Sequence, residues 1–285
     1  MLPSLQCLDL INLNALEYML ESSSPAEPFF PSLKTLNLYG LRNFKGWCRR
    51  EIAGEQAPSF PLLSELVISS CDQLTALQLL SSPCLSKLDI WNCSCLESLQ
   101  LPSLPCLEEL NLCRVREEIV WQIILVSSSL KSLHIWGIND LVSLPDDRLQ
   151  HLTSLKSLQI IDCELMSLFH GIQHLSALEE LRIINCRQLN LSDKEDDDGG
   201  LQFQGLRSLR QLFIQDIPKL VSLPTGLQHV TTLETLSIFL CSDFTALPDW
   251  ISSLASLSKL EISMCPRFKL EDRSKIAHIP TIDRL

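Results

Sequence analysis

With 285 residues, 46% of them hydrophobic, the chain has ample material for a core. Its net charge of −11 and pI near 5.0 argue against a nucleic-acid partner, because phosphate contacts require clustered Lys and Arg. No apolar run reaches the roughly 18 residues that a membrane span needs, and the N-terminus MLPSLQCLDL lacks the basic flank of a secretory signal peptide. We therefore expect a cytoplasmic protein without a membrane span.

A short leucine pattern recurs along the whole chain. It is clearest in LSELVISSCDQLTAL (63–77) and returns in LSKLDIWNCSCLESL (85–99). The first half of each copy alternates as a strand does, and the second half steps by threes through a turn. The first leucines of the copies, numbered 0 below, are Leu5, Leu33, Leu63, Leu85, Leu107, Leu130, Leu155, Leu178, Leu209, Leu233 and Leu257. Because +3 and +5 are Leu or Ile in every copy, the pattern is the leucine-rich-repeat signature.

This periodicity predicts an α/β solenoid of about eleven repeats. Each copy contributes one strand, and the strands stack as a parallel sheet on the concave face of a curved horseshoe, about 4.8 Å apart. The leucines point inward, and loops or short helices return on the convex face. One copy cannot cover its own hydrophobic face, so stability comes from stacking on neighbours. We predict one repeat domain over 1–270 and a C-terminal cap or tail over 271–285.

The chain has twelve cysteines, and six of them fall at +8 of their copies. These six are Cys71, Cys93, Cys163, Cys186, Cys241 and Cys265. A small buried side chain at +8 can turn the backbone away from the sheet, so we predict a structural ladder of reduced thiols that behave as small hydrophobes. Neighbouring rungs are close enough for a bridge by distance alone, yet the periodicity explains them without oxidation. Cys93 and Cys95 form a lone CxC, and no metal site is expected.

Three copies are long, and solenoid insertions usually form loops on one face. The extra segments are 21–30, 42–60 and 191–200. The acidic run 193–198 does not fit a calcium loop, because Asp198 stands where glycine is required, and a solvated loop is predicted instead.

No catalytic or cofactor motif accompanies the repeats. His170 and His174 are four residues apart but lack the HExxH arrangement of a zinc site, so a loop or convex-surface position is expected. A GxxxxGK(S/T) phosphate loop and a GxSxG elbow are also missing. We do not expect an enzyme.

The outward positions of adjacent strands should align into columns across the concave face. At +6 these positions should meet solvent, yet six are large and apolar: Tyr39, Trp91, Trp136, Ile161, Ile184 and Phe239. The +4 column adds Arg182 and Phe213. An exposed apolar band with polar neighbours commonly marks an interaction surface, so these eight residues are predicted to bind a partner. Alternatively, they pack on one another and merely stiffen the sheet.

Several segments go beyond the generic repeat. They are FPSLKTLNLYGLRNFKGW (30–47), FPLLSELVISSC (60–71), LVSLPTGLQHVTTLETLSIFLC (220–241), TALPDWISSLASLSKLEISMCP (245–266) and the ending SKIAHIPTIDRL (274–285). Over essentially its whole length the chain resembles the C-terminal leucine-rich-repeat region of plant coiled-coil-type nucleotide-binding leucine-rich-repeat immune receptors. The resemblance implies recognition of a pathogen effector or a guarded host protein. ADP or ATP would belong to a nucleotide-binding domain that this sequence does not contain.

Other functions stay open at this stage. The same face could contact the receptor's own nucleotide-binding domain and restrain its switch. An extracellular receptor is favoured by two sequons, at Asn92 and Asn190, but not by the missing signal peptide or the absence of LxGxIP repeats. An F-box-type adaptor solenoid is a further alternative, although no F-box segment precedes the repeats in this sequence. Because the leucines of the first strand have no polar cap before them, we expect a fragment or a truncated gene product.

Overall fold

The computed structural model groups the chain into two compact units, Met1–Ile138 and Asn139–Leu285, each built on six parallel strands. The residues that the structure describes are 4–20, 30–48, 60–78, 82–101, 103–168, 171–191, 203–270 and 272–283.

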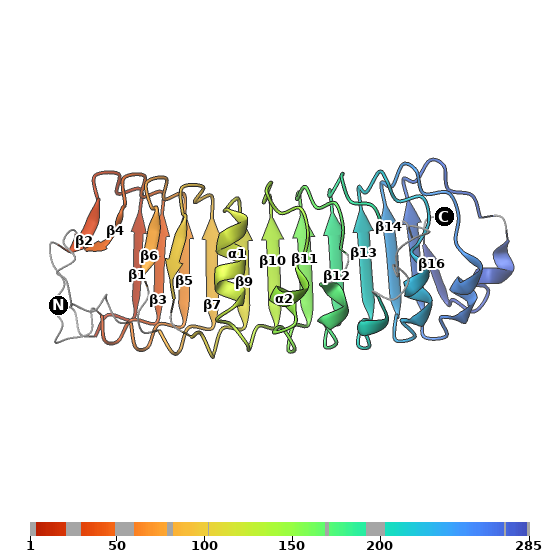
Figure 1. Cartoon of the computed structure of the whole chain (residues 1–285), viewed down its shortest axis with the longest axis horizontal. Helices are drawn as coiled ribbons and strands as arrows, with labels where there is room; N and C mark the ends of the chain where they lie inside the picture. The colour runs from red at the N-terminus through yellow and green to blue at the C-terminus, as the bar shows by residue number, and fades with distance from the viewer. Residues whose placement is uncertain are drawn as a thin grey trace. The chain divides into compact units, whose positions relative to one another are not determined.

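The sheet of the first unit has one strand from each copy, in chain order (Figure 1). Its strands are β1 (Cys7–Ile11), β3 (Thr35–Tyr39), β5 (Glu65–Ser69), β7 (Lys87–Trp91), β9 (Glu109–Cys113) and β10 (Ser132–Trp136). The register joins equivalent positions of neighbouring copies, as when Leu66 pairs with Leu88 and Ile68 with Ile90. Each inward leucine therefore stacks on its own counterpart.

The second unit repeats this design. Its strands are β11 (Ser157–Ile161), β12 (Glu180–Ile184), β13 (Gln211–Gln215), β14 (Thr235–Phe239), β15 (Lys259–Ser263) and β16 (Thr281–Asp283). Every strand from β11 to β15, like the six of the first unit, spans positions +2 to +6 of a predicted copy. The predicted leucine-rich-repeat solenoid, with a parallel sheet built from the copies, is confirmed.

The segment 271–285, predicted as a cap or tail, contributes one more strand to the sheet. The 3-10 turn η5 (Arg273–Ile276) leads into β16, which pairs with β15 through Leu260 and Ile282. Buried Ile279 stands at position 0 of this degenerate copy. This strand was hard to foresee because isoleucines replace the leucines of the pattern.

Along each strand, buried side chains alternate with side chains that reach solvent. In β7, Leu88 and Ile90 are 0% exposed, whereas Trp91, the next residue, is 41% exposed. Successive side chains of a strand point to opposite faces, so the +3 and +5 positions fill the core in every predicted copy after the first, where Leu8 and Leu10 are half-buried. The +2, +4 and +6 positions are left on the other side, which we call the sheet face.

Every copy leaves the sheet through one residue with a left-handed backbone at +7. The φ angles there lie between 50° and 64°, in Asn12, Gly40, Ser70, Asn92, Arg114, Gly137, Asp162, Asn185, Asp216, Leu240 and Met264. The amide of this residue continues the ladder, since the Asn92 N–H donates to the Cys113 carbonyl at 2.8 Å. The sequence pattern predicts the turn at the cysteines at +8. The structure places it one residue earlier, and the +8 side chain then re-enters the core.

Short elements cover the side of each sheet opposite the sheet face (Figure 1). In the first unit they are β2 (Tyr18–Leu20) paired with β4 (Gly46–Cys48), β6 (Ala76–Gln78) paired with β8 (Ser98–Gln100), and α1 (Glu117–Ile124). In the second unit they are α2 (Asp146–Leu149), η1 (Ile172–His174), η3 (Thr225–His229) and η4 (Asp249–Ser253). Short helices were predicted here. The three-residue strands were not, because so short a run has no periodicity of its own.

The helix α1 replaces a loop because its sequence is amphipathic. Glu117 and Glu118 in its first turn favour the helix N-terminus, where the peptide dipoles are positive. Ile119 and Ile123 are 0% exposed, so this side of the helix is buried in the core. Among the described residues, no helix is long and apolar enough to cross a bilayer.

We expect Met264→Asn to stabilise the protein. Met264 has φ 56° and a side chain that is 70% exposed, so the substitution loses little burial. A left-handed backbone costs an ordinary residue about 1 to 2 kcal/mol, and Asn tolerates it better. The free energy of unfolding from urea titration should rise by about 1 kcal/mol. Ser263→Asn, at the preceding strand position, is the matched control; an equal gain there would contradict the explanation.

Candidate functional site

The sheet face of the first unit carries a row of exposed aromatic side chains at +6. Tyr39, Trp91 and Trp136 are 37%, 41% and 46% exposed. They belong to alternate strands, and half-buried Ser69 and Cys113 occupy the strands between them. Large and small side chains therefore alternate along this row, which we call the aromatic row.

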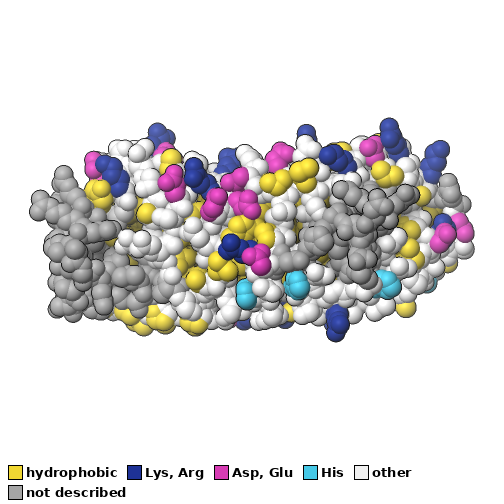
Figure 2. Space-filling view, in the orientation of Figure 1, with side chains coloured by type: hydrophobic (Ala, Val, Ile, Leu, Met, Phe, Trp, Pro, Cys, Tyr) yellow, Lys and Arg dark blue, Asp and Glu magenta, His cyan; other side chains and the backbone are white. Residues whose placement is uncertain are grey.

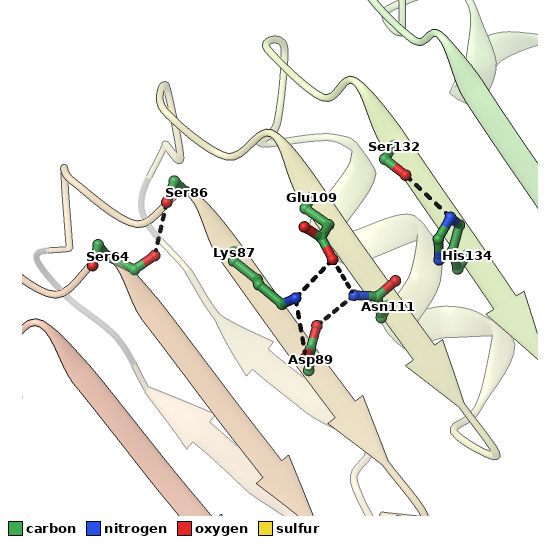
Figure 3. Close-up of polar contacts among 8 residues, drawn as sticks. All are labelled: Ser64, Ser86, Lys87, Asp89, Glu109, Asn111, Ser132 and His134. Carbon is green, nitrogen blue, oxygen red and sulfur yellow. Dashed lines mark hydrogen bonds and ion pairs between the residues drawn. The ribbon is translucent and has the colours of Figure 1, made fainter. Parts of the chain in front are cut away.

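Beside the aromatic row lies a network of polar side chains on β7 and β9 (Figure 3). The Lys87 ammonium lies 2.8 Å from a Glu109 oxygen and 3.9 Å from an Asp89 oxygen. The Asn111 amide donates to Asp89 at 2.6 Å and to Glu109 at 2.9 Å. Figure 3 also shows His134 directed at Ser132 on its own strand. These contacts fix the side chains in place across neighbouring copies.

The network shifts the pKa of its carboxylates in opposite directions. Burial raises the pKa of Asp89, against the hydrogen bond from Asn111 and the charge of Lys87. Hydrogen bonds from Lys87 and Asn111 lower the pKa of Glu109, which is more exposed. The hydrogen bond to Glu109 raises the pKa of Lys87. The +2 positions, which take part here through Lys87 and Glu109, were not among the predicted site residues, although the same alternation would have identified them.

In the second unit the predicted residues contact one another. The Arg182 guanidinium lies over the Phe213 ring at 5.4 Å from its centroid, and the Phe213 and Phe239 ring centroids are 5.3 Å apart. Arg182 also forms an ion pair with Glu180 on its own strand. All of these side chains are half-buried.

The two isoleucines of the prediction are also neighbours in the second unit. Ile161 and Ile184 pair directly across β11 and β12, and both are half-buried. Packing between neighbouring copies therefore accounts for much of the apolar surface in this unit. The partner-binding role of these residues stays a prediction.

The six cysteines at +8 line up as a ladder behind the turns. Five are buried and Cys265 is half-buried. Each thiol donates to the carbonyl two residues earlier, as Cys93 does to Trp91 at 3.4 Å and Cys186 to Ile184 at 3.6 Å. None of the six ladder cysteines forms a disulfide. The thiol thus acts both as core filler and as a weak donor that holds the turn.

Burial raises the pKa of Cys186 to about 11, so its reactive thiolate is scarce at neutral pH. The hydrogen bond between Cys71 and Cys93 instead raises the pKa of Cys71 and lowers that of Cys93. At the C-terminal end of the ladder, the hydrogen bond between the two thiols lowers the pKa of Cys265 and raises that of Cys241.

The remaining predicted features give no further site in the part of the chain that the structure describes. The acidic run 193–198, His170 and most of the three long insertions lie outside the described residues. His174 is half-buried at the end of η1. No group of three or more His, Cys, Asp or Glu side chains among the described residues is placed to hold a metal ion.

Acidic and basic side chains are interspersed on the face of the molecule that Figure 2 shows.

Comparison with known proteins shows similarity at the level of fold. No protein-family model and no curated protein matches the sequence. Among solved structures, the leucine-rich-repeat domain of the type III effector XopL is 23% identical over 71% of this chain and 72% of that domain, with a TM-score of 0.44. The ectodomain of the Arabidopsis thaliana receptor kinase GASSHO1/SCHENGEN3, in complex with Casparian strip integrity factor 2, is 16% identical over 98% of this chain and 38% of its own, with a TM-score of 0.49.

A third match comes from a bacterial protein. The functional domain of InlJ from Listeria monocytogenes, which includes a cysteine ladder, is 16% identical over 98% of this chain and 67% of its own, with a TM-score of 0.42. At these identities and TM-scores, the likeness concerns the repeat fold and transfers no residue role or partner. The site is therefore described from its own geometry.

Cysteine reactivity tests the ladder. We expect iodoacetamide to label the exposed Cys84, Cys95 and Cys106 quickly, and the buried ladder thiols only after unfolding, because burial keeps the reagent from reaching the thiol. Mass spectrometry of the digested protein, with time points before and after urea, measures each site. A buried rung labelled as fast as Cys84, or recovered as a disulfide, would contradict the ladder of reduced thiols.

The raised pKa of Asp89 predicts that Asp89→Asn stabilises the protein more at high pH than at low pH. Above the ordinary carboxyl value of 3.8, the native state holds this proton more tightly than the unfolded chain does. The contribution of Asp89 to the free energy of unfolding therefore falls as pH rises from 3.8 through the raised value. Urea titrations should show Asp89→Asn gaining stability over wild type at pH 7 relative to pH 4.

Glu179 provides a control of opposite sign for this prediction. The hydrogen bond from Lys156 lowers the pKa of Glu179, so this group contributes stability that is lost as pH falls through its lowered value. Glu179→Gln should therefore lose stability at pH 7 relative to pH 4. If both variants gained stability at pH 7 relative to pH 4, or if neither did, the raised pKa of Asp89 would be contradicted.

Proposed function

We propose that this chain is a protein-recognition module that binds its partner through the sheet face of the first unit. The observation that carries the proposal is the aromatic row. Tyr39, Trp91 and Trp136 keep more than a third of their surface exposed on a face whose polar neighbours already bond to one another. Exposed Trp and Tyr in such surroundings are the residue types that most often anchor protein interfaces.

Energetics favour a binding role over a stiffening role for this row. A large apolar side chain gains about 1.5 to 3 kcal/mol on full burial, and the three aromatic residues have realised only part of this gain. Half-buried Ser69 and Cys113 separate them, so they do not stand on adjacent strands. In the second unit, by contrast, Phe213 and Phe239 cover each other.

We further propose that the partner is a pathogen effector or a guarded host protein, and that the chain belongs to a plant intracellular immune receptor of the coiled-coil type. Support comes from the sequence segments that resemble those receptors, 30–47, 60–71, 220–241 and 245–266. The nucleotide-binding domain that forms the switch would lie elsewhere in such a receptor. The repeat module would supply recognition alone.

A cytoplasmic location is part of the proposal. Supporting it, the six ladder cysteines are free thiols, which is the usual state of thiols in a reducing compartment. The sequon at Asn92 has another explanation, since Asn92 stands at +7 and has the left-handed backbone that asparagine tolerates well. Its presence does not require glycosylation.

Display selection with matched variants tests the proposal. Libraries of secreted pathogen proteins and host proteins are selected on the chain, and the affinity of each binder is then measured. Trp91→Ala/Trp136→Ala should weaken binding at least about tenfold, or about 1.4 kcal/mol, while circular dichroism stays unchanged. Leu62→Ala/Leu125→Ala is the control, because these residues are 46% and 49% exposed but lie off the sheet face.

The selection can also reject the proposal. Binders that respond equally to both double variants would place recognition outside the aromatic row. An absence of any binder above background from libraries that contain both partner classes would contradict a recognition module altogether.

A further inference from the structure

The spacing of the aromatic row selects the conformation of what can bind along it. Neighbouring strands of a sheet lie about 4.8 Å apart, so Tyr39, Trp91 and Trp136, on alternate strands, recur at about 9.6 Å. Small Ser69 and Cys113 stand between them. The row therefore offers two equivalent positions, each bounded by two large aromatic side chains and floored by a small one.

A ligand running across the strands must present a side chain to these positions with the same period. A polyproline II segment has three residues per turn and rises about 3.1 Å per residue, so one of its edges repeats every 9.3 Å or so. An extended strand repeats on one face at about 6.6 to 6.8 Å, and two turns of an α-helix span about 10.8 Å. The polyproline II period fits the aromatic row best.

The chemistry of the row suits the same ligand. Aromatic-lined surfaces are a recurring platform for proline-rich segments, whose preformed shape limits the entropy lost on binding. A polyproline II backbone makes no internal hydrogen bonds, so its carbonyls are available to donors on the protein. The Tyr39 hydroxyl and the Trp91 indole N–H are donors of that kind at the edge of apolar rings.

Charge determines what should flank the prolines. On one side of the aromatic row, the +2 and +4 positions of the first unit carry the carboxylates of Asp9, Glu65, Asp89 and Glu109 against the single ammonium of Lys87. That ammonium is already paired with Glu109. This side of the row is therefore acidic. On the other side, exposed Arg114 follows the end of β9.

We propose that the aromatic row binds a proline-rich segment in the polyproline II conformation, with its basic residues directed at the acidic +2 and +4 positions. The inference rests on the proposed recognition function and names the class of partner segment. Every third side chain of the segment packs over Ser69 or Cys113, between aromatic walls. Its Lys or Arg residues lie toward Asp9 and Glu65, both of which are exposed.

Synthetic peptides titrated against the full chain test this inference by fluorescence anisotropy. The probe is a labelled peptide with three Leu-Pro-Pro units and an arginine at each end. One control replaces every proline by glycine and keeps the leucines and charges, and a second replaces the arginines by glutamates. We expect each control to bind at least about tenfold more weakly than the probe. Equal binding of the probe and the glycine control would overturn the inference.

Variants of the chain locate the binding. Trp91→Ala removes a wall shared by both positions, and Ser69→Phe fills one position while leaving all three aromatic residues in place. Each should weaken probe binding at least about tenfold with an unchanged circular dichroism spectrum. Glu65→Lys should weaken it and flatten its salt dependence. Leu62→Ala, off the sheet face, should have no effect. Probe binding that survives both Trp91→Ala and Ser69→Phe would place the peptide elsewhere and overturn the inference.

The outcome can be separated from that of the proposed function. If selected protein partners respond to Trp91→Ala/Trp136→Ala but the proline-rich probe does not bind, the recognition function stands and the polyproline II inference fails. If neither the probe nor any selected partner responds to the aromatic row, both fail.

Discussion

The turn that ends each strand is the constraint on which the rest of the structure depends. A copy must bury aliphatic side chains at +3 and +5 and then leave the sheet without breaking its hydrogen-bond ladder. The left-handed residue at +7 meets both demands, because the chain bends there while its amide still bonds to the next strand, as Asn92 does to Cys113. With the same turn in every copy, equivalent positions stay in register, and Leu66 stacks on Leu88.

The sheet face follows from that register. Side chains at +2, +4 and +6 meet the equivalent side chains of neighbouring copies, so a polar residue finds its partner one strand away. Asn111 bonds to Asp89 in this manner, and Arg182 stacks on Phe213. Where large and small residues alternate instead, as in the aromatic row, the small side chain leaves part of the neighbouring ring uncovered. Trp91 keeps its exposed surface beside half-buried Cys113 for this reason.

The cysteine ladder shows how one side chain serves the core and the turn together. At +8 the chain has just bent, and an apolar group must fill the space behind the strand. A thiol fits there and donates a weak hydrogen bond to the carbonyl at +6, as Cys93 does to Trp91. Leu41 and Ile138, which occupy +8 in other copies, fill the space without that bond. Repetition therefore places cysteines next to one another for packing reasons.

Sequence alone determined the sheet strand of each of the eleven copies, because three aliphatic positions recur there at fixed spacing and are buried together. It also determined which residues stand on the sheet face, since alternation follows from the geometry of a strand. Tertiary structure decided the rest. Leu240 and Met264 have no preference for a left-handed backbone and adopt it because the neighbouring strands demand it. The burial of Asp89 and the contact between Phe213 and Phe239 depend on side chains 22 or more residues away. The one-dimensional repeat carries no record of such contacts between copies.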